Sequence, residues 1–149
     1  MRLDGQVLVF DEVTGVFTPQ YWRLRLAEEC RRSERYLHFF SVLTIDATPF
    51  LWGKEDRSRI EKLIEMANLL RSNVRSTDIL SFMENQHFAL ILPETPYEGA
   101  EAVRRRLSEL IRLTEGEKPI RMRIAVYPRD GTNDLDLMER VNLPLITGG

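Results

Sequence analysis

Two apolar runs joined by three polar residues constrain the fold of this chain more than any other feature of its sequence. Residues 79–83 and 87–92 are rich in branched and aromatic side chains, and Glu84, Asn85 and Gln86 lie between them. Runs of this length with a short polar connection are typical of a β-hairpin. The sequence therefore predicts two antiparallel strands that are neighbours along the chain and in the sheet.

Segments with strand and helix patterns alternate on both sides of this hairpin. Further strands are predicted at residues 7–10, 39–45 and 120–127. Helices are predicted from Pro19, over residues 60–74, after a capping box at residues 95–98, and after a cap at Thr132 or Asn133. A hairpin within such an alternation predicts an α/β (α+β) fold, with a single mixed sheet of about five strands and helices packed on it. Its core resembles the βαββαβ plan of ferredoxin-like domains.

The first predicted helix has one apolar stripe, because Trp22, Leu26 and Cys30 recur every four residues. We expect Cys30 to be a core residue on this stripe. The opposite face of the helix is predicted to be polar, with Arg23, Arg25, Glu29, Arg32 and Glu34.

The composition describes one domain and excludes several classes of protein. The chain has 149 residues, a net charge of −2 and a single cysteine. The charge gives no basic excess for nucleic acid, no internal disulfide can form, and no apolar run approaches the roughly 20 residues that cross a bilayer. The chain begins Met1-Arg2-Leu3-Asp4-Gly5, which lacks the apolar run of a secretion signal. We expect a cytoplasmic protein without membrane insertion and without a nucleic-acid partner.

Common catalytic and binding motifs are missing from the sequence. It contains neither of the usual glycine-rich phosphate loops and no G-x-S-x-G motif. His38 and His87 are far apart in the sequence, and with Cys30 alone they give no zinc pattern. We interpret His38 as a surface or edge residue, and we predict no metal site and no cofactor.

Five segments in the same order and with similar spacing resemble the GGDEF family, the diguanylate cyclases that join two GTP molecules into cyclic di-GMP. The resemblance covers residues 11–141, within one domain of residues 1–149, and it implies a nucleotidyl-cyclase-like GGDEF fold. The segments are D-E-V-T-G-V at residues 11–16 with Y-W at 21–22, the strand at 39–46, R-S-N-V-R-S-T-D at 71–78, F-A-L-I-L-P-E-T at 88–95 and Y-P-R-D-G-T at 127–132.

The residues that the family uses for catalysis are replaced at the matching positions. The G-G-D-E stretch falls on Glu84, Asn85, Gln86 and His87, which we call the signature turn, and the first aspartate of the family's D-I-D falls on Thr44. In the family these acids hold a divalent metal against the triphosphate, and magnesium prefers carboxylate oxygens. The resemblance therefore implies that the chain has no catalytic residues, is not an enzyme and binds no metal, although Asp46 matches the second aspartate.

Part of a second family site is retained. Arg75 and Asp78 match the R-x-x-D of the inhibitory site, where cyclic di-GMP binds, and Arg106 matches the basic residue that the next helix contributes. An arginine can bind phosphate or a guanine edge, and an aspartate can accept guanine N–H bonds. The alternative is a structural turn in which Asp78 pairs with Arg75 and accepts backbone bonds. Exposed and unpaired side chains would favour the ligand site, and a closed ion pair would disfavour it.

Several other residues have two interpretations. His87 is either a ligand donor or a tolerated hairpin residue. Arg121 and Arg123 form either a basic patch for a partner or an ordinary exposed strand face. In the loop of residues 49–56, Phe50 and Trp52 either form an exposed partner contact or pack across a helix end.

These observations predict a catalytically inactive GGDEF-like domain that acts as a protein-interaction or dimerisation module in bacterial signalling. The alternative is a cyclic di-GMP receptor that binds through Arg75, Asp78 and Arg106. The expected partners are another protein or a second copy of the chain, with cyclic di-GMP as a candidate ligand. The sequence leaves open whether these residues belong to a larger multidomain protein.

Overall fold

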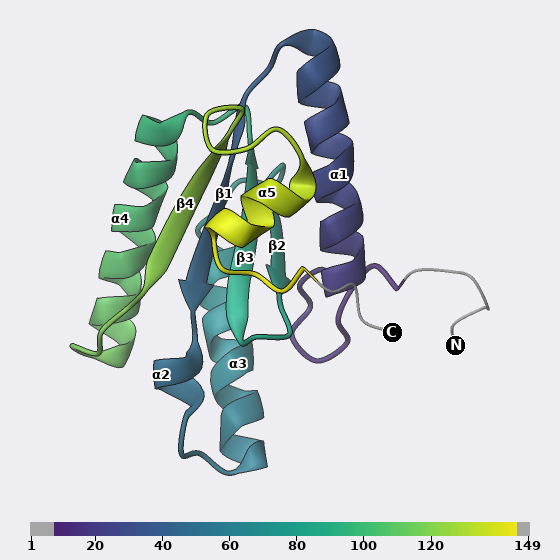
Figure 1. The fold of residues 1–149 in the computed structure, drawn as a ribbon. Helices are drawn as coiled ribbons and strands as arrows, with labels where there is room; N and C mark the ends of the chain where they lie inside the picture. Colours follow the sequence, from purple (N-terminus) through teal and green to yellow (C-terminus); the bar gives the residue numbers. More distant parts are fainter. Residues whose placement is uncertain (1–7, 146–149) are drawn as a thin grey trace.

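A four-stranded antiparallel sheet forms the centre of the computed structural model, which describes residues 8–145 (Figure 1). The order of the strands in the sheet is β2-β3-β1-β4. The strands are β1 (Phe40–Asp46), β2 (Ile79–Phe82), β3 (His87–Pro93) and β4 (Met122–Tyr127). Helices cover both faces, which explains why the central strands β1 and β3 consist almost entirely of buried residues.

Five helices flank this sheet in the described part of the chain. They are α1 (Pro19–Tyr36), α2 (Thr48–Leu51), α3 (Asp56–Arg71), α4 (Tyr97–Glu115) and α5 (Asp134–Arg140). The side chain of Thr18 accepts a bond from the Tyr21 N–H and Pro19 occupies the first turn, so α1 begins where the sequence predicts. Asn133 likewise caps α5 by accepting from the Asp136 N–H at 2.9 Å.

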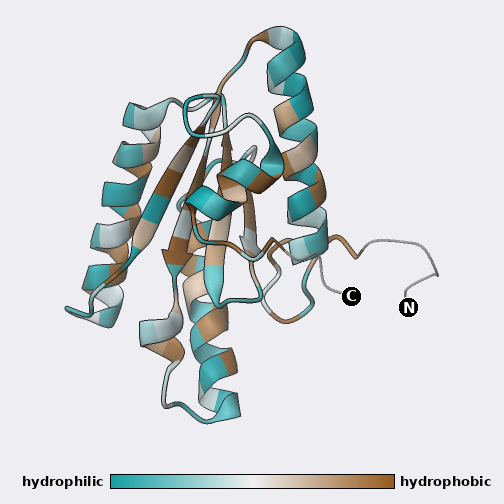
Figure 2. Cartoon of the chain, in the orientation of Figure 1, coloured by the Kyte–Doolittle hydropathy of each residue, from teal (hydrophilic) through white to brown (hydrophobic). Residues whose placement is uncertain are grey.

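The core has two halves, one on each face of the sheet. Leu43 and Ile45 of β1 pack on α2, α3 and α4, whereas Phe40 and Val42 point to α1 and α5. Figure 2 shows the matching pattern, with hydrophobic residues along the strands and hydrophilic residues along the outer sides of the helices. The predicted stripe of Trp22, Leu26 and Cys30 is confirmed as the buried face of α1.

The predicted α+β fold and its βαββαβ core are confirmed, with two corrections. Strands β1 and β2 run parallel, but β3 lies between them, so all neighbouring strands in the sheet are antiparallel instead of mixed. The fifth strand, predicted at residues 7–10, does not form within the described residues: Phe10 makes one isolated bridge, to Phe17. Val7 and the chain start at residues 1–5 lie outside the described residues.

Two local predictions were wrong. The capping box at residues 95–98 does not form, because α4 begins at Tyr97 with Pro96 as its cap, and the Thr95 hydroxyl donates instead to the Pro93 carbonyl at 2.9 Å. The loop after β1 contains the short helix α2, which the sequence did not predict. Of the two interpretations of its aromatic residues, Phe50 follows the packed one, because it is completely buried in the core, whereas Trp52 is 83% exposed. No helix among residues 8–145 is long and apolar enough to span a membrane.

Candidate functional site

The signature turn joins β2 to β3 and has a tightly bonded backbone. The Met83 N–H donates to the His87 carbonyl at 2.7 Å, and the Gln86 N–H donates to the Met83 carbonyl at 3.1 Å. Gln86 has a φ of 62°, a left-handed conformation that a residue with a side chain seldom adopts. Its carbonyl accepts from the Ala47 N–H at 2.9 Å, which fixes the turn to the end of β1.

The side chains of the turn are tied to two distant parts of the chain. Both carboxylate oxygens of Glu84 accept from the guanidinium of Arg23 on α1, at 2.7 and 2.9 Å. The Asn85 amide donates to the Asn142 carbonyl, just beyond α5, at 2.8 Å. Partial burial raises the pKa of Glu84, but the Arg23 hydrogen bonds and charge outweigh it and hold that pKa below its ordinary value. The turn is therefore held by α1 on one side and by the segment after α5 on the other.

The end of β1 lies beside this turn. Thr44 is 1% exposed, and its hydroxyl donates to the Val141 carbonyl at 3.1 Å. Asp46 accepts from the Thr48 N–H at 2.9 Å, and its carboxylate lies 4.0 Å from Nδ1 of His87. His87 is buried, with Nδ1 3.0 Å from the Asn85 carbonyl oxygen. Residues 8–145 contain no cluster of three or more histidine, cysteine, aspartate or glutamate side chains arranged to hold a metal.

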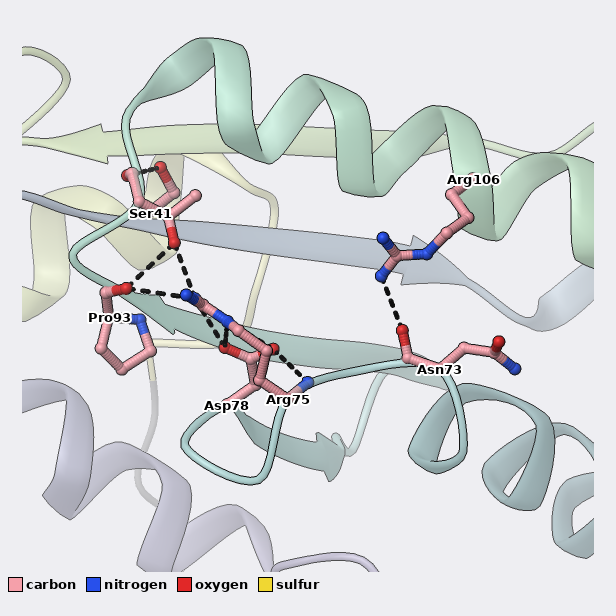
Figure 3. Close-up of polar contacts among 7 residues, drawn as sticks. Ser41, Asn73, Arg75, Asp78, Pro93 and Arg106 are labelled. Atoms are coloured by element: carbon pink, nitrogen blue, oxygen red, sulfur yellow. Dashed lines mark hydrogen bonds and ion pairs between the residues drawn. The ribbon is translucent and has the colours of Figure 1, made fainter.

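Arg75 and Asp78 form a closed ion pair in the turn before β2 (Figure 3). The carboxylate of Asp78 accepts from the Arg75 backbone N–H at 2.8 Å and from the Arg75 guanidinium at 3.0 Å. The guanidinium also donates to the Thr95 hydroxyl at 2.8 Å and the Pro93 carbonyl at 3.2 Å. The Asp78 side chain is 3% exposed and that of Arg75 is 57% exposed. This geometry matches the structural turn more closely than an open ligand site.

Arg106 does not join this pair. Its guanidinium reaches from α4 to the Asn73 carbonyl, at 2.6 Å, and Figure 3 shows it apart from Arg75 and Asp78. The structure thus brings together two of the three side chains that the sequence assigned to the ligand site. The roles of all three in ligand binding remain predictions.

Two cavities flank the turn of Arg75 and Asp78, with volumes of about 400 and 590 Å³. Both are lined by Phe17, Arg75, Ser76 and Asp78. The larger one also borders α1 at Glu29, whose Oε2 atom is buried without a hydrogen-bond partner and lies 3.6 Å from the Arg32 guanidinium. Both cavities therefore lie directly beside the side chains that the sequence assigned to the ligand site.

Sequence reasoning misplaced two residues of α1. Arg23 and Glu29 were assigned to the polar face, but they are only 8% and 5% exposed. Each lies one position away from a residue of the buried stripe, Trp22 or Cys30, and this proximity is the signal that could have revealed them. Phe17 was missed because it lies between two predicted elements.

The family model described as diguanylate cyclase, GGDEF domain, matches residues 8–145. The chain belongs to the GGDEF family, and it is a signalling domain of the diguanylate cyclase family.

Individual relatives agree with this assignment. The chain is 30% identical over 116 residues to the uncharacterized membrane protein YdaK of Bacillus subtilis, covering 72% of this chain and 40% of that protein. It is 25% identical over 117 residues to the probable diguanylate cyclase DgcC of Escherichia coli, covering 75% of this chain and 29% of that protein. The chain therefore spans less than half the length of these curated relatives.

Solved structures confirm the fold. The GGDEF domain of DgcB from Caulobacter crescentus, in complex with c-di-GMP, superposes with a TM-score of 0.76 over 95% of this chain and 88% of that one, at 13% identity.

The comparisons overturn the expectation that this chain is not an enzyme. The matching family model is that of the diguanylate cyclases, and DgcC is named a probable diguanylate cyclase. The expectation rested on residue types at positions counted along the sequence. Residue types at the signature turn and at Thr44 do not by themselves determine what a folded domain can bind, because neighbouring elements also contribute groups.

Proposed function

We propose that this GGDEF domain acts in bacterial signalling as a protein-interaction or dimerisation module. The observation that carries this proposal is the internal pairing at both sites that the family resemblance identifies. Arg75 pairs with Asp78, Arg23 with Glu84, and Thr44 with the Val141 carbonyl. Side chains already bonded within the chain must break those bonds before they bind a ligand, whereas surface recognition leaves them in place.

The surface supports this proposal. Leu37 is 90% exposed at the end of α1, and Trp52 is 83% exposed after α2. Large apolar side chains are costly to leave in water, and aromatic residues and arginine are enriched where proteins meet.

Two measurements test the proposal. Sedimentation velocity over a wide concentration range reports self-association of the purified domain. Capture from a lysate of the source bacterium, followed by reconstitution with each purified candidate, reports a different partner. Self-association or a reconstituted complex supports the module. A domain that stays monomeric and forms no reconstituted complex contradicts it.

A second candidate function is binding of cyclic di-GMP, which is favoured by the two cavities that flank the turn of Arg75 and Asp78. Arg75 is more than half exposed although it is paired, so its guanidinium could turn toward a ligand. The similar domain of DgcB was solved in complex with c-di-GMP. Binding would require opening the Arg75–Asp78 pair, and this cost makes the receptor the second candidate.

Isothermal titration calorimetry with cyclic di-GMP tests this candidate, with magnesium–GTP as a parallel ligand. Binding that is lost in Arg75→Ala and retained in Arg106→Ala would support a site at the turn without Arg106. No heat from cyclic di-GMP at high protein concentration would eliminate the receptor.

A further inference from the structure

The two edges of the sheet are protected differently. The edge at β2 is covered, since the Phe17 N–H donates to the Leu80 carbonyl at 2.9 Å and the Trp22 indole donates to the Ile79 carbonyl at 3.1 Å. An uncovered edge strand offers its backbone groups to another strand, and proteins usually cover or charge such edges. The opposite edge is β4, which pairs with β1 and with no other strand of residues 8–145.

The register shows which backbone groups of β4 point away from the sheet. The Asp46 N–H donates to the Arg121 carbonyl at 2.9 Å, so Arg121 and alternate residues after it bond to β1. The backbone groups of Val126 therefore point away from β1. Its N–H donates to the Asp130 carboxylate at 2.8 Å, and its carbonyl accepts from the Asp130 N–H at 2.7 Å. The outward N–H and C=O groups of Met122 and Ile124 have no hydrogen-bond partner within residues 8–145.

Two arginines stand on this open part of the edge. Arg121 directly precedes β4, and Arg123 lies within it. They alternate with Met122, so their side chains share one face of this edge, and both are exposed. Neither makes a side-chain hydrogen bond or an ion pair with any other described residue. Other arginines, such as Arg104 and Arg112, are paired with glutamates. The edge thus combines unused backbone groups with unpaired positive charge on a chain whose net charge is −2.

A second copy of the chain is a poor occupant of this edge. Pairing of β4 with the β4 of another copy would set Arg121 and Arg123 against the same arginines, and like charges on facing strands destabilise a sheet. In many proteins a charged residue on an edge strand prevents pairing with another strand. A strand that carries acidic side chains would instead be attracted to Arg121 and Arg123 and could pair with this edge.

We propose that the free edge of β4 receives an extended segment of a partner protein with acidic side chains at alternate positions. The backbone of the segment bonds to Met122 and Ile124, and its acids pair with Arg121 and Arg123. Because Asp130 occupies the outward backbone groups of Val126, the segment cannot pair beyond Ile124. The paired stretch is therefore short, and its register is fixed at that end. This proposal rests on the proposed interaction function and names the surface and the partner chemistry.

A model peptide tests the proposal directly. Nuclear magnetic resonance of the labelled domain is followed during titration with the capped peptide Glu-Val-Glu-Val-Glu. We expect saturable shifts of the Met122 and Ile124 amide resonances and slower exchange of these two amides. The same peptide with lysine in place of glutamate should leave the resonances unchanged. No response of β4 to the acidic peptide, or an equal response to both peptides, would overturn the proposal.

Variants separate charge from backbone pairing. Arg121→Glu/Arg123→Glu should weaken binding of the acidic peptide by about tenfold or more, because two attractive contacts become repulsive. The matched control is Arg31→Glu/Arg57→Glu, which reverses two exposed arginines on α1 and α3 and should bind as the wild type does. Met122→Pro removes one outward N–H without removing a β1–β4 bond, and it should also weaken binding. Circular dichroism of each variant verifies folding.

The outcomes distinguish this proposal from the function on which it rests. Where a reconstituted partner or self-association persists unchanged in Arg121→Glu/Arg123→Glu, the β4 edge is not the interface and the interaction module stands. Where no partner and no self-association are found, the proposed interaction function is wrong.

Discussion

Arg23 and Glu84 lie 61 positions apart in the sequence and form a two-bonded ion pair that connects α1 to the signature turn. The Arg23 side chain is 9% exposed and that of Glu84 is 45% exposed. Glutamine at this position removes the negative charge and one of the two acceptor oxygens from a nearly buried guanidinium, while the exposure of Glu84 screens part of the effect. We expect Glu84→Gln to lower the free energy of unfolding by about 1–2 kcal/mol, measured by urea denaturation.

The pH dependence of this pair has a definite sign. The folded-state pKa of Glu84 lies below its ordinary value of 4.5, so the pair stabilises the fold above that pH and is lost as the pH falls through the lowered pKa. The difference in unfolding free energy between wild type and Glu84→Gln should shrink below pH 4.5. A difference that stays constant through this range would show that the carboxylate charge does not stabilise the fold.

Substitutions at Thr44 test how the segment after α5 is fixed to β1. Thr44→Val removes the bond to the Val141 carbonyl at nearly constant volume and should cost about 1 kcal/mol. Thr44→Asp places a carboxylate against that carbonyl in a buried position, and the cost should exceed about 2 kcal/mol. Thermal unfolding measures both. Equal stability of the two variants would contradict this account.

Leu37 ends α1 in a left-handed conformation, with φ 56° and ψ 38°, and its side chain is 90% exposed. Glycine adopts this conformation without steric cost, so Leu37→Gly should raise the free energy of unfolding by about 0.5–1 kcal/mol. Leu135→Gly is the control, since Leu135 is 50% exposed within α5, where glycine should destabilise by about 1 kcal/mol. A destabilised Leu37→Gly would indicate that Leu37 packs in the folded monomer.

The Cys30 thiol should be unreactive in the folded domain. Burial, followed by the charges of Asp134 and Glu29, raises the pKa of Cys30 from 9.0 to about 12. Because the thiolate is the reactive form, an aromatic disulfide reagent should modify Cys30 slowly in the native protein and rapidly in urea. The same shift should destabilise the fold as the pH rises from 9 toward 12, and Cys30→Ala should remove that part of the loss. Fast modification of the native protein would contradict the burial.

Most of the fold could be predicted from the sequence, because buried residues recur along the chain with the period of a helix or a strand. The hairpin and the stripe of Trp22, Leu26 and Cys30 could be predicted because apolar spacing records which side of an element faces the core. The short helix α2 and the burial of Phe50 were missed, since four residues carry no measurable period. Phe17 was missed for the same reason, because a single residue that bonds to the β2 edge shows no periodic pattern.

The candidate site was less accessible to sequence reasoning, because its contacts join distant positions. Arg75 and Asp78 are three residues apart, and their pairing was one of the two alternatives. The hydroxyl of Thr95 is not available to cap α4, because it donates to the Pro93 carbonyl and accepts from Arg75, 20 positions away. Arg23 looked like a surface residue because its partner lies in another element. Such pairings depend on tertiary structure, which local spacing does not encode.

The two tryptophans of this domain lie in opposite environments, so their intrinsic fluorescence reports on two different parts of the molecule. Trp22 is fully buried against β2 and should emit at short wavelength and resist acrylamide, whereas Trp52, which follows α2, should emit at long wavelength and be quenched readily. A partner that covers the α2 end of the molecule would therefore shield Trp52 alone, and loosening of α1 from the sheet would expose Trp22 alone. Fluorescence from the unmodified chain can thus report which part of the domain responds to a partner.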